Sequence, residues 1–281
     1  MIDYHIHTNH SVDAQGTLKE YAEQALKLGL KEICITNHCE LDPARNDNLI
    51  RLENENLPLN RGNLLILAEE TSRLKDYYKK KGLKIKFGLE VGYFSGVTRR
   101  LKEIIYGLKL DYLLTGIHCL DHICIDSSKE CDRYFSQKCA ADLLVNYYKT
   151  LKELVKSKEF DAIAHLDVYK KYGLAFYGED IKKIPEDILR PIFKSMTKNG
   201  IALEINTAGL RRYGEFYPSG DIMKIAKEEG IELITIGSDC HRPEDLGKGI
   251  KEAIEYARSY NFKYILTFEN RRPEPLLMKW L

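Results

Sequence analysis

Short apolar runs alternate with longer segments of helical periodicity along most of this chain. Apolar runs rich in β-branched residues and bounded by polar residues or glycine are typical of buried β-strands. Seven such runs occur, at Ile2–His7, Glu32–Asn37, Lys84–Glu90, Tyr112–His118, Phe160–Leu166, Ile201–Asn206 and Glu232–Asp239. A regular alternation of strand and helix predicts a parallel sheet.

The segments between these runs carry helix start and stop signals. Thr17 and Glu20 have the spacing of a capping box, which predicts a helix from residue 18 onward. Apolar residues recur at helical spacing from 143 to 155 and predict a second helix. Pro185 and Gly200 enclose a third amphipathic segment, with proline at its start and glycine at its end.

The seven strands predict one domain over residues 1–281, built as a closed or nearly closed (β/α)7 barrel. A doubly wound open sheet is the alternative architecture. The chain has no internal repeat and no Gly/Ser-rich linker, and the Asn/Arg-rich segment 42–63 is interpreted as a long loop. A strand-like stretch at 264–268 has no assigned place in this scheme.

Charge and cysteine content limit the possible binding partners and the expected cellular compartment. The 43 Lys and Arg residues balance 42 Asp and Glu residues, for a formal net charge of +1. No global field therefore favours nucleic acid or a membrane surface. The seven cysteines are scattered, and none forms a C-x-x-C pair. With no apolar run approaching about 18 residues and no leader-like start, we expect a cytoplasmic protein.

All eight histidines lie in or just after predicted strand ends. In α/β barrels, the carboxyl ends of the strands and the loops after them form the active site, so these side chains should converge. His5 and His7 point to one side of their strand because side chains alternate faces. Asp239 and His241 repeat this spacing at the last strand. The two pairs predict a shared metal site.

Four further ligand candidates end other strands. His38, His118 and His165 each follow an apolar run, and Glu90 ends another. A single buried histidine is more often a hydrogen-bonded core residue, but several at equivalent positions require partners in one small volume. A buried carboxylate is costly unless it is paired or ligated, and Glu90 could bridge two metals.

Three residues lie in the loops just beyond the strand ends. His10 and His122 are better interpreted as residues that support the site or face solvent. Asp13 precedes the first predicted helix and either supports a turn or completes a third metal site.

Together these motifs resemble the polymerase and histidinol phosphatase (PHP) superfamily. The motifs are DYHIH (3–7), TNH (36–38), GLE (88–90), GIH (116–118), AHLD (164–167) and SDCH (238–241). The resemblance implies a distorted (β/α)7 TIM-like barrel with two to three divalent metal ions. By the family pattern, the first metal is held by His5, His7, Glu90 and Asp239, the second by Glu90, His118 and His165, and the third by Asp13, His38 and His241. The Asp13 carboxylate favours manganese or iron over zinc, with mixed occupancy as an option.

Segments 165–173, 204–212 and 238–244 are similar to the histidinol-phosphatases of this superfamily. The resemblance implies hydrolysis of L-histidinol phosphate to L-histidinol and phosphate in histidine biosynthesis, with no nucleic-acid or membrane partner. The sequence gives no oligomeric state.

The expected chemistry requires groups that bind phosphate and move protons. Arg211 or Arg212 could clamp a phosphate oxygen, with ordinary surface arginines as the alternative. Asp239, His241 and Asp167 are the catalytic candidates, and Asp167 or a histidine of the ligand set would protonate the leaving alkoxide.

Three other functional classes stay open. An amidohydrolase also uses H-x-H on its first strand but usually has a metal-bridging lysine. A PHP nuclease or polymerase-editing domain would be expected to carry a basic stripe or stacking aromatics. A non-catalytic metal-binding protein is the third.

Overall fold

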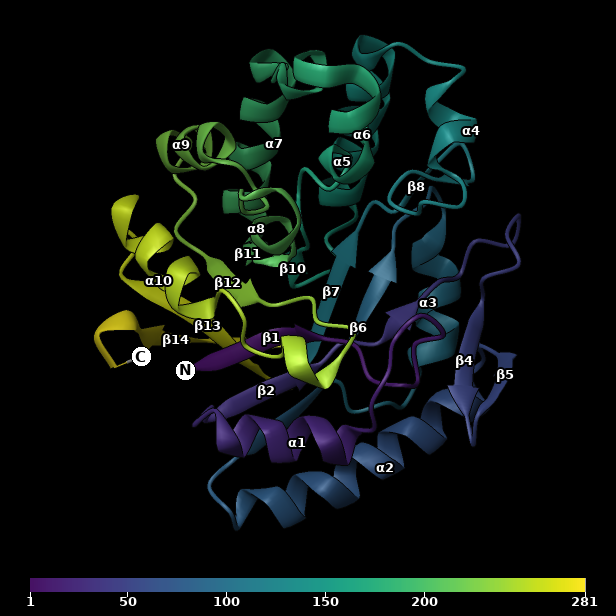
Figure 1. Cartoon of the computed structure of the whole chain (residues 1–281), viewed down its shortest axis with the longest axis vertical. Coiled ribbons are helices and arrows are strands. Elements are labelled where there is room, and N and C mark those ends of the chain that lie inside the picture. The colour runs from purple at the N-terminus through teal and green to yellow at the C-terminus, as the bar shows by residue number, and fades with distance from the viewer. Residues whose placement is uncertain (281) are drawn as a thin grey trace.

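The computed structural model describes residues 1–280 and contains a parallel β-barrel surrounded by helices (Figure 1). Its strands follow one another around the barrel in chain order, each parallel to the next. They are β1 (Ile2–Ile6), β2 (Glu32–Ile35), β6 (Lys84–Gly92), β7 (Tyr112–Gly116), β10 (Ala162–Ile163), β11 (Ala202–Asn206) and β12 (Ile234–Gly237). The seven predicted strands are therefore confirmed, most of them slightly shorter than expected.

Backbone hydrogen bonds between the first and last strand segments nearly close the ring. The amide of Asp239 donates to the carbonyl of His5 over 2.8 Å, and the amide of His7 donates to that of Cys240 over 3.0 Å. The short strand β3 (His38–Cys39) continues the direction of β2 and pairs with β6, which places His38 beside Glu90. The open-sheet alternative is wrong, because β1 and the segment after β12 meet.

Helices cover the outside of the barrel. In Figure 1, α1 (Leu18–Lys27) and α2 (Arg61–Lys79) lie on one side of the strands, and α5 (Ala140–Ser157), α7 (Glu186–Asn199) and α9 (Gly220–Glu228) lie on the other. The outer layer also includes α3 (Val97–Ile105) and α10 (Ile250–Ser259), with shorter helices α4 (Cys131–Phe135), α6 (Lys170–Tyr177) and α8 (Ala208–Tyr213). Short 3₁₀ turns lie at Gly178–Lys182, Pro243–Asp245 and Met278–Trp280.

The helix start and stop signals predicted from the sequence are present in the structure. The Thr17 hydroxyl accepts from the amide of Glu20, and the Glu20 carboxylate accepts from the amide of Thr17, which completes the capping box. Gly200 follows α7 at φ +69°, where a residue without a Cβ is least strained.

The interpretation of 42–63 as a loop is wrong in part. This segment contains an antiparallel hairpin of β4 (Leu49–Leu52) and β5 (Glu55–Pro58). Glu53 and Asn54 form its two-residue turn with φ of 50° and 68°. Such a turn normally carries glycine or asparagine at both positions, so the sequence pattern with Glu53 did not predict it.

The strand-like stretch near the C-terminus also has a place. It forms an antiparallel hairpin of β13 (Tyr264–Glu269) and β14 (Arg272–Leu277). The amide of Phe268 donates to the Tyr4 hydroxyl, and the ring of Phe268 lies 4.6 Å from that of Tyr112. The Arg271 guanidinium donates to Asp161, which lies just before β10. The hairpin thus packs where these strands begin and leaves their carboxyl ends open.

Candidate metal centre

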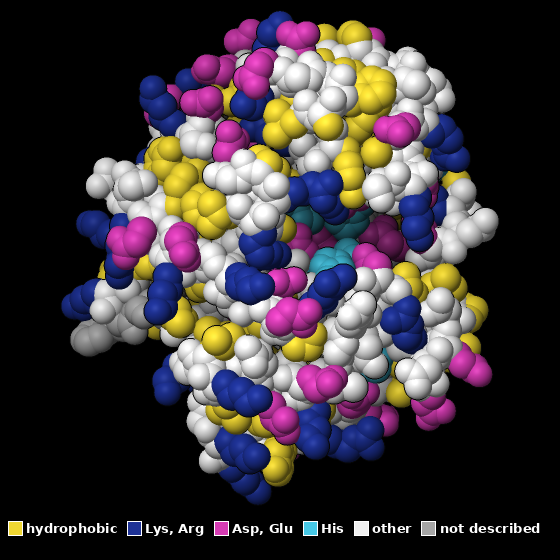
Figure 2. All heavy atoms as spheres, viewed as in Figure 1, with side chains coloured by type: hydrophobic (Ala, Val, Ile, Leu, Met, Phe, Trp, Pro, Cys, Tyr) yellow, Lys and Arg dark blue, Asp and Glu magenta, His cyan; other side chains and the backbone are white. Residues whose placement is uncertain are grey.

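The histidines and carboxylates of interest gather at the carboxyl ends of the strands, in the hollow at the centre of Figure 2. His5 and His7 come from β1 and point to the same side, whereas Ile6 packs outward among the apolar residues next to α1. The Nε2 atoms of His5 and His7 lie 3.0 Å apart. Both histidine side chains are fully buried.

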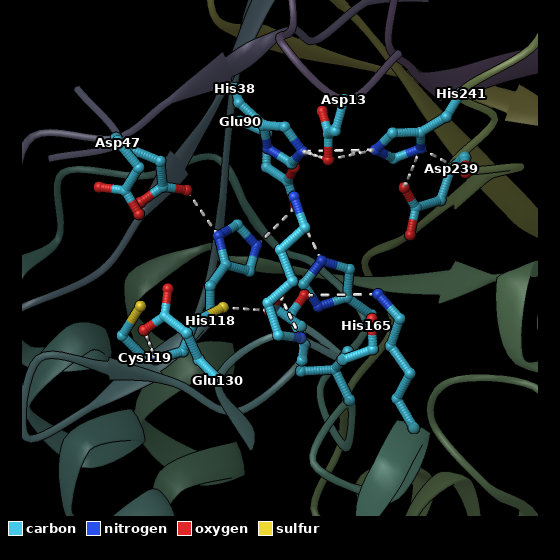
Figure 3. A pocket seen from close by; sticks show the side chains of 18 of the residues that line it. Asp13, His38, Asp47, Glu90, His118, Cys119, Glu130, His165, Asp239 and His241 are labelled. Atoms are coloured by element: carbon cyan, nitrogen blue, oxygen red, sulfur yellow. Dashed lines mark hydrogen bonds and ion pairs between the residues drawn. The ribbon is translucent and has the colours of Figure 1, made fainter. Parts of the chain in front are cut away.

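Glu90 lies in the middle of the cluster (Figure 3). Its Oε1 is 2.7 Å from His165 Nε2 and 3.2 Å from His118 Nε2. Its Oε2 is 3.0 Å from His38 Nδ1, and lies 3.3 and 3.4 Å from the Nε2 atoms of His5 and His7. The side chain of Glu90 is 1% exposed. One buried carboxylate therefore contacts imidazoles that come from four other strand ends.

Asp239 and Asp13 complete the two more exposed sides of the cluster. Asp239 Oδ1 lies 3.4 Å from His7 Nε2 and 3.6 Å from His5 Nε2. Asp13 Oδ2 lies 3.6 Å from His38 Nε2 and 3.5 Å from His241 Nε2. The Asp13 side chain is 56% exposed, whereas that of Asp239 is 16% exposed. Every residue expected to bind metal thus lies in one continuous cluster.

The donor atoms of this cluster fit divalent metal ions. His5 Nε2 and His7 Nε2 face each other, and Glu90 Oε2 is buried without a hydrogen-bond donor. Lone pairs that converge in a buried volume are unfavourable unless protons or cations lie between them. Sets of three candidate ligand atoms lie within 4.8 Å of one another, and they include His5, His7 and Glu90, as well as Glu90, His118 and His165. Imidazole and carboxylate donors suit zinc, iron or manganese.

The electrostatics are those of a tightly coupled site. Burial acts to raise the pKa of Glu90, but the charges of His5 and His118 outweigh it and hold that pKa well below its usual range. Burial acts to lower the pKa of His5, and the carboxylates of Glu204 and Glu90 raise it well above its usual value. Burial and the neighbouring His38 lower the pKa of His7. The cluster therefore concentrates negative carboxylates where a cation would bind.

Two carboxylates that contact histidines of the cluster were not anticipated from the sequence. Glu204 Oε1 lies 2.7 Å from His5 Nδ1, and Glu40 Oε1 lies 2.7 Å from His118 Nδ1. In metal sites, such carboxylates fix the ring orientation of the histidine and leave the other nitrogen for the metal. A buried glutamate within a predicted strand, as in the run 201–206, was the available signal for Glu204.

Glycines leave room for these rings. A Cβ added at Gly116 would lie 2.4 Å from His165 Cε1 and 2.9 Å from His118 Nε2. A Cβ at Gly237 would lie 2.2 Å from the Cβ of His5. Any side chain at either position would displace a candidate ligand.

The two remaining histidines contact other groups. His10 Nδ1 lies 2.8 Å from the carbonyl of Arg51, and its Nε2 lies 3.0 Å from Glu70 Oε2. His122 Nδ1 lies 2.6 Å from Asp42 Oδ2, and its side chain is 58% exposed. His10 joins the loop that carries Asp13 to the β4–β5 hairpin and α2, so it supports the site from outside.

The two candidate arginines lie in different surroundings. Arg211 donates to the Thr207 hydroxyl and to the backbone carbonyls of Ser238 and Asp239. Its guanidinium therefore braces the backbone at Asp239, whose φ of 52° is unusual for a residue with a side chain. Arg212 lies against the Tyr172 ring, 4.4 Å from its centroid, and lines the cavity. Arg212 is thus the arginine in a position to meet a ligand.

Asp167 lies away from the cavity wall. Its side chain is fully buried, and its Oδ2 accepts from Lys170 Nζ at 2.8 Å and from the amide of Ser219 at 3.1 Å. Asp239 and His241, in contrast, line the cavity. The geometry therefore gives Asp167 a structural ion pair and offers no support for its expected role as proton donor.

The cluster forms the floor of a cavity with a volume of about 430 Å³. Its wall carries basic and acidic residues, which include Arg45, Lys171, Arg212, Asp47, Asp126 and Glu130. Arg45 pairs with Asp47 and Glu130, and Lys171 lies near Asp126. A cavity of this size, with both charge signs on its wall, suits a small molecule that carries both charges. Among residues 1–280, no helix combines the length and apolar character needed to cross a bilayer.

By fold and site, the chain is an α/β barrel with a cluster of histidines and carboxylates, which could hold metal ions, at the carboxyl ends of its strands. The model of the PHP domain family matches residues 3–208, and the chain belongs to this family. This confirms the resemblance seen in the sequence motifs.

Similar proteins span nearly the whole chain. A probable histidinol-phosphatase of Deinococcus radiodurans is 29% identical and covers 98% of this chain and 99% of its own length. One from Thermotoga maritima is 29% identical over 94% of each chain. A histidinol-phosphatase of Bacillus subtilis is 28% identical over 90% of this chain and 98% of its own.

Solved structures confirm the fold. A histidinol phosphate phosphatase of Lactococcus lactis, complexed with zinc, L-histidinol and phosphate, matches with a TM-score of 0.79 at 22% identity. The match covers 97% of this chain and 98% of that one. A putative histidinol phosphatase of Listeria monocytogenes matches with a TM-score of 0.74 at 22% identity, over 90% of this chain and 99% of that one.

Proposed function

We propose that this protein hydrolyses L-histidinol phosphate to L-histidinol and phosphate, a step of L-histidine biosynthesis. The observation that carries this proposal is the contact of one buried carboxylate, Glu90, with histidines from four other strand ends on the floor of a cavity. The names of the similar proteins supply the substrate.

The candidate ligands divide into three sets of donors. His5, His7, Glu90 and Asp239 would hold one metal ion, and Glu90, His118 and His165 a second. Asp13, His38 and His241 would hold a third ion more weakly, because Asp13 comes from a loop and is more than half exposed. The proposal is two to three divalent ions of manganese, iron or zinc.

When bound, divalent metal ions supply positive charge beside the phosphoryl oxygens and lower the pKa of a water molecule toward about 7. Phosphomonoesters hydrolyse extremely slowly without such help. The protein's own contribution is to position the substrate and to move protons.

Residues on the cavity wall suit these tasks. Arg212 and Lys171 present positive charge to a phosphate, and Arg212 is held in place by the Tyr172 ring and by the carbonyl of Lys171. Asp239, whose pKa is held low by His5 despite burial, stays ionised and would accept a hydrogen bond from the attacking water. His241, at the cavity wall, would deliver a proton to the leaving oxygen.

The rival classes receive less support. An amidohydrolase usually has a lysine between its metals, but the buried Lys86 and Lys170 pair with Glu269 and Asp167, and Lys171, which lines the cavity, lies 3.7 Å from Asp126. In place of a lysine, Glu90 occupies the middle of the cluster. A nuclease would bind an extended strand, whereas both basic and acidic residues line this cavity.

The proposal treats residues 1–281 as one domain, acting in the cytoplasm without nucleic-acid or membrane partners. All seven cysteines are free thiols, which suits a reducing compartment.

Phosphate release from a substrate panel tests the function. The protein, purified without chelator, would be assayed with L-histidinol phosphate, p-nitrophenyl phosphate and single-stranded DNA. We expect L-histidinol phosphate to exceed p-nitrophenyl phosphate in kcat/KM by at least about a hundredfold, or roughly 2.7 kcal/mol, because a specific pocket uses the remote groups of its substrate to orient the phosphate.

Equal kcat/KM values for the two phosphomonoesters would support a phosphatase but contradict L-histidinol phosphate as its specific substrate. Nucleotide release from DNA without phosphate release from L-histidinol phosphate would replace the proposal with a nuclease. The exposed Glu103, which does not line the cavity, gives the control variant Glu103→Gln, whose activity should equal that of the wild type.

A further inference from the structure

Two cysteines face each other on a short β-ribbon at the cavity wall. The ribbon consists of β8 (Cys119–Leu120) and β9 (Ile123–Cys124), which pair antiparallel with Cys119 opposite Cys124. It starts directly after His118, a candidate metal ligand, and both thiols line the cavity. Figure 3 shows Cys119 on the same side of the site as His118 and Glu130.

The backbone of the ribbon places the two cysteines at disulfide distance. Asp121 and His122 form a two-residue turn with φ of 49° and 61°, and the amide of Ile125 donates to the carbonyl of His118. In such a ladder, Cys119 and Cys124 are a non-hydrogen-bonded pair, whose Cα atoms lie about 4.5 Å apart. Disulfides span Cα separations from about 4.4 to 6.8 Å.

The pair differs from the other cysteines of the chain. Cys119 and Cys124 are both partly exposed, whereas Cys34, Cys39, Cys131 and Cys240 are buried. Cys139 is exposed but lies at the start of α5, where its thiol contacts Asp142. Small reagents in the cavity can therefore reach two thiols that already face each other.

We propose that Cys119 and Cys124 form a redox modification site, where a small-molecule disulfide such as glutathione disulfide converts the two thiols into an intramolecular disulfide and lowers turnover. The hydrogen bond to Cys119 and burial raise the pKa of the Cys124 thiol, so Cys119 attacks the reagent, releases one glutathione and is left in a mixed disulfide. The other cysteine then attacks that sulfur and releases the second glutathione. The two cysteines lose two electrons and two protons, and the reagent is reduced to two thiols.

Oxidation removes a hydrogen bond in the cavity. The Cys124 thiol donates to Asp126 Oδ1 at 2.8 Å, and a disulfide sulfur has no proton to donate. Asp126 Oδ2 lies 3.7 Å from Lys171 Nζ, so a shift of this carboxylate changes the charge environment of the cavity. The lower turnover rests on the proposed phosphatase function, but formation of the disulfide does not.

The ribbon is also connected to the adjoining part of the cavity wall. Glu130 accepts from the amide of Cys124 and pairs with Arg45 at 2.8 Å, and Arg45 also donates to the carbonyl of His122. A change in the ribbon is therefore transmitted to this wall as well as to His118 at its base.

Peptide mapping of the metal-loaded protein tests the modification. After incubation with glutathione disulfide and alkylation, trypsin releases residues 110–129, which contain Cys119 and Cys124 and no other cysteine. We expect this peptide to lose two hydrogen atoms and to escape alkylation, while phosphate release from p-nitrophenyl phosphate falls at least about threefold, equivalent to about 0.65 kcal/mol. A phosphine reductant should restore both.

Variants separate this site from general oxidation. Cys139→Ser should keep the full response, whereas Cys119→Ser and Cys124→Ser should each lose the intramolecular disulfide and the reversible fall in turnover. An alkylated peptide 110–129 in the oxidised wild type, or glutathione found on Cys139 alone, would overturn the proposal. A disulfide that leaves turnover unchanged would overturn its functional half.

Discussion

Glu204 Oε1 lies 2.7 Å from Nδ1 of His5, although the two residues are 199 positions apart in the chain. The same glutamate accepts from the amide of His165 at 2.8 Å and from the Asn206 side chain at 3.0 Å. One buried carboxylate from β11 therefore fixes a ring on β1 and the backbone at a neighbouring strand end. Through these contacts, Glu204 orients two candidate ligands, His5 and His165, and is not itself one of the proposed ligands.

Loss of this carboxylate should weaken metal binding without abolishing the fold. Glu204→Gln keeps the size of the side chain but removes the charge that orients the His5 ring. We expect the affinity for the metal to fall about 10- to 100-fold. Competition with a chelator measures this change, and Glu274→Gln, on the exposed strand β14, is the matched control. An unchanged affinity would show that Glu204 has no orienting role.

Asp13 offers a test of how the metals are divided. Its carboxylate contacts only His38 and His241 among the candidate ligands. Asp13→Ala should therefore lose about one metal equivalent and keep the others. Elemental analysis of the purified variant measures the content. Loss of every metal, or of none, would contradict the three sets of donors proposed above.

The two neighbouring arginines should behave differently. Arg212→Ala removes a positive charge from the cavity and should lower kcat/KM at least about tenfold, or roughly 1.4 kcal/mol, for every phosphomonoester. Arg211→Ala should instead lower metal content, because its guanidinium holds the backbone carbonyls of Ser238 and Asp239. Kinetics and metal analysis of both variants decide the matter. The same phenotype from both would refute this division of roles.

The pair of His10 and Glu70 should make stability depend on pH. Burial acts to lower the pKa of His10, but hydrogen bonds to Glu70 and to the Arg51 carbonyl raise it overall, and the bond to His10 lowers the pKa of Glu70. The raised His10 pKa contributes stability below about pH 6.5 that is lost as the pH rises through the folded value. The lowered Glu70 pKa contributes stability above about pH 4.3 that is lost as the pH falls.

Both contributions are therefore present together at about pH 5 to 6. We expect Glu70→Gln to lower the unfolding free energy there by only about 1 kcal/mol, because Glu70 is partly exposed. The cost should be smaller at pH 8, where His10 has lost its charge. Urea unfolding at the two pH values measures the difference. A cost that grows from pH 6 to pH 8 would contradict the charged pair.

The barrel and most of the candidate ligands could be predicted because both depend on short-range patterns. Alternation along β1 places His5 and His7 on one side, and the parallel arrangement brings strand ends together. The β4–β5 hairpin escaped prediction because Glu53 is an unfavourable residue for its left-handed turn. The local sequence pattern thus indicates where strands end, but it does not predict a turn whose residues are unfavourable and which tertiary contacts stabilise.

Side-chain partners across the barrel could not be predicted in the same way. Arg211 and Arg212 are neighbours in the sequence, but one contacts backbone carbonyls and the other faces the cavity. Asp167 follows a candidate ligand closely, but its partner is Lys170, one helical turn on. These outcomes depend on the three-dimensional direction of each side chain, which no residue spacing specifies.

Glu90→Gln is the most direct test of the metal centre as one catalytic unit. The substitution keeps the volume of a buried side chain and removes the charge that contacts five histidines of the cluster, His5, His7, His38, His118 and His165. Metal content and kcat/KM for L-histidinol phosphate would be measured on the same preparation, with Glu103→Gln as the control. We expect both to fall, with kcat/KM down at least about a hundredfold, or roughly 2.7 kcal/mol. A variant with full metal content and full kcat/KM would contradict the account.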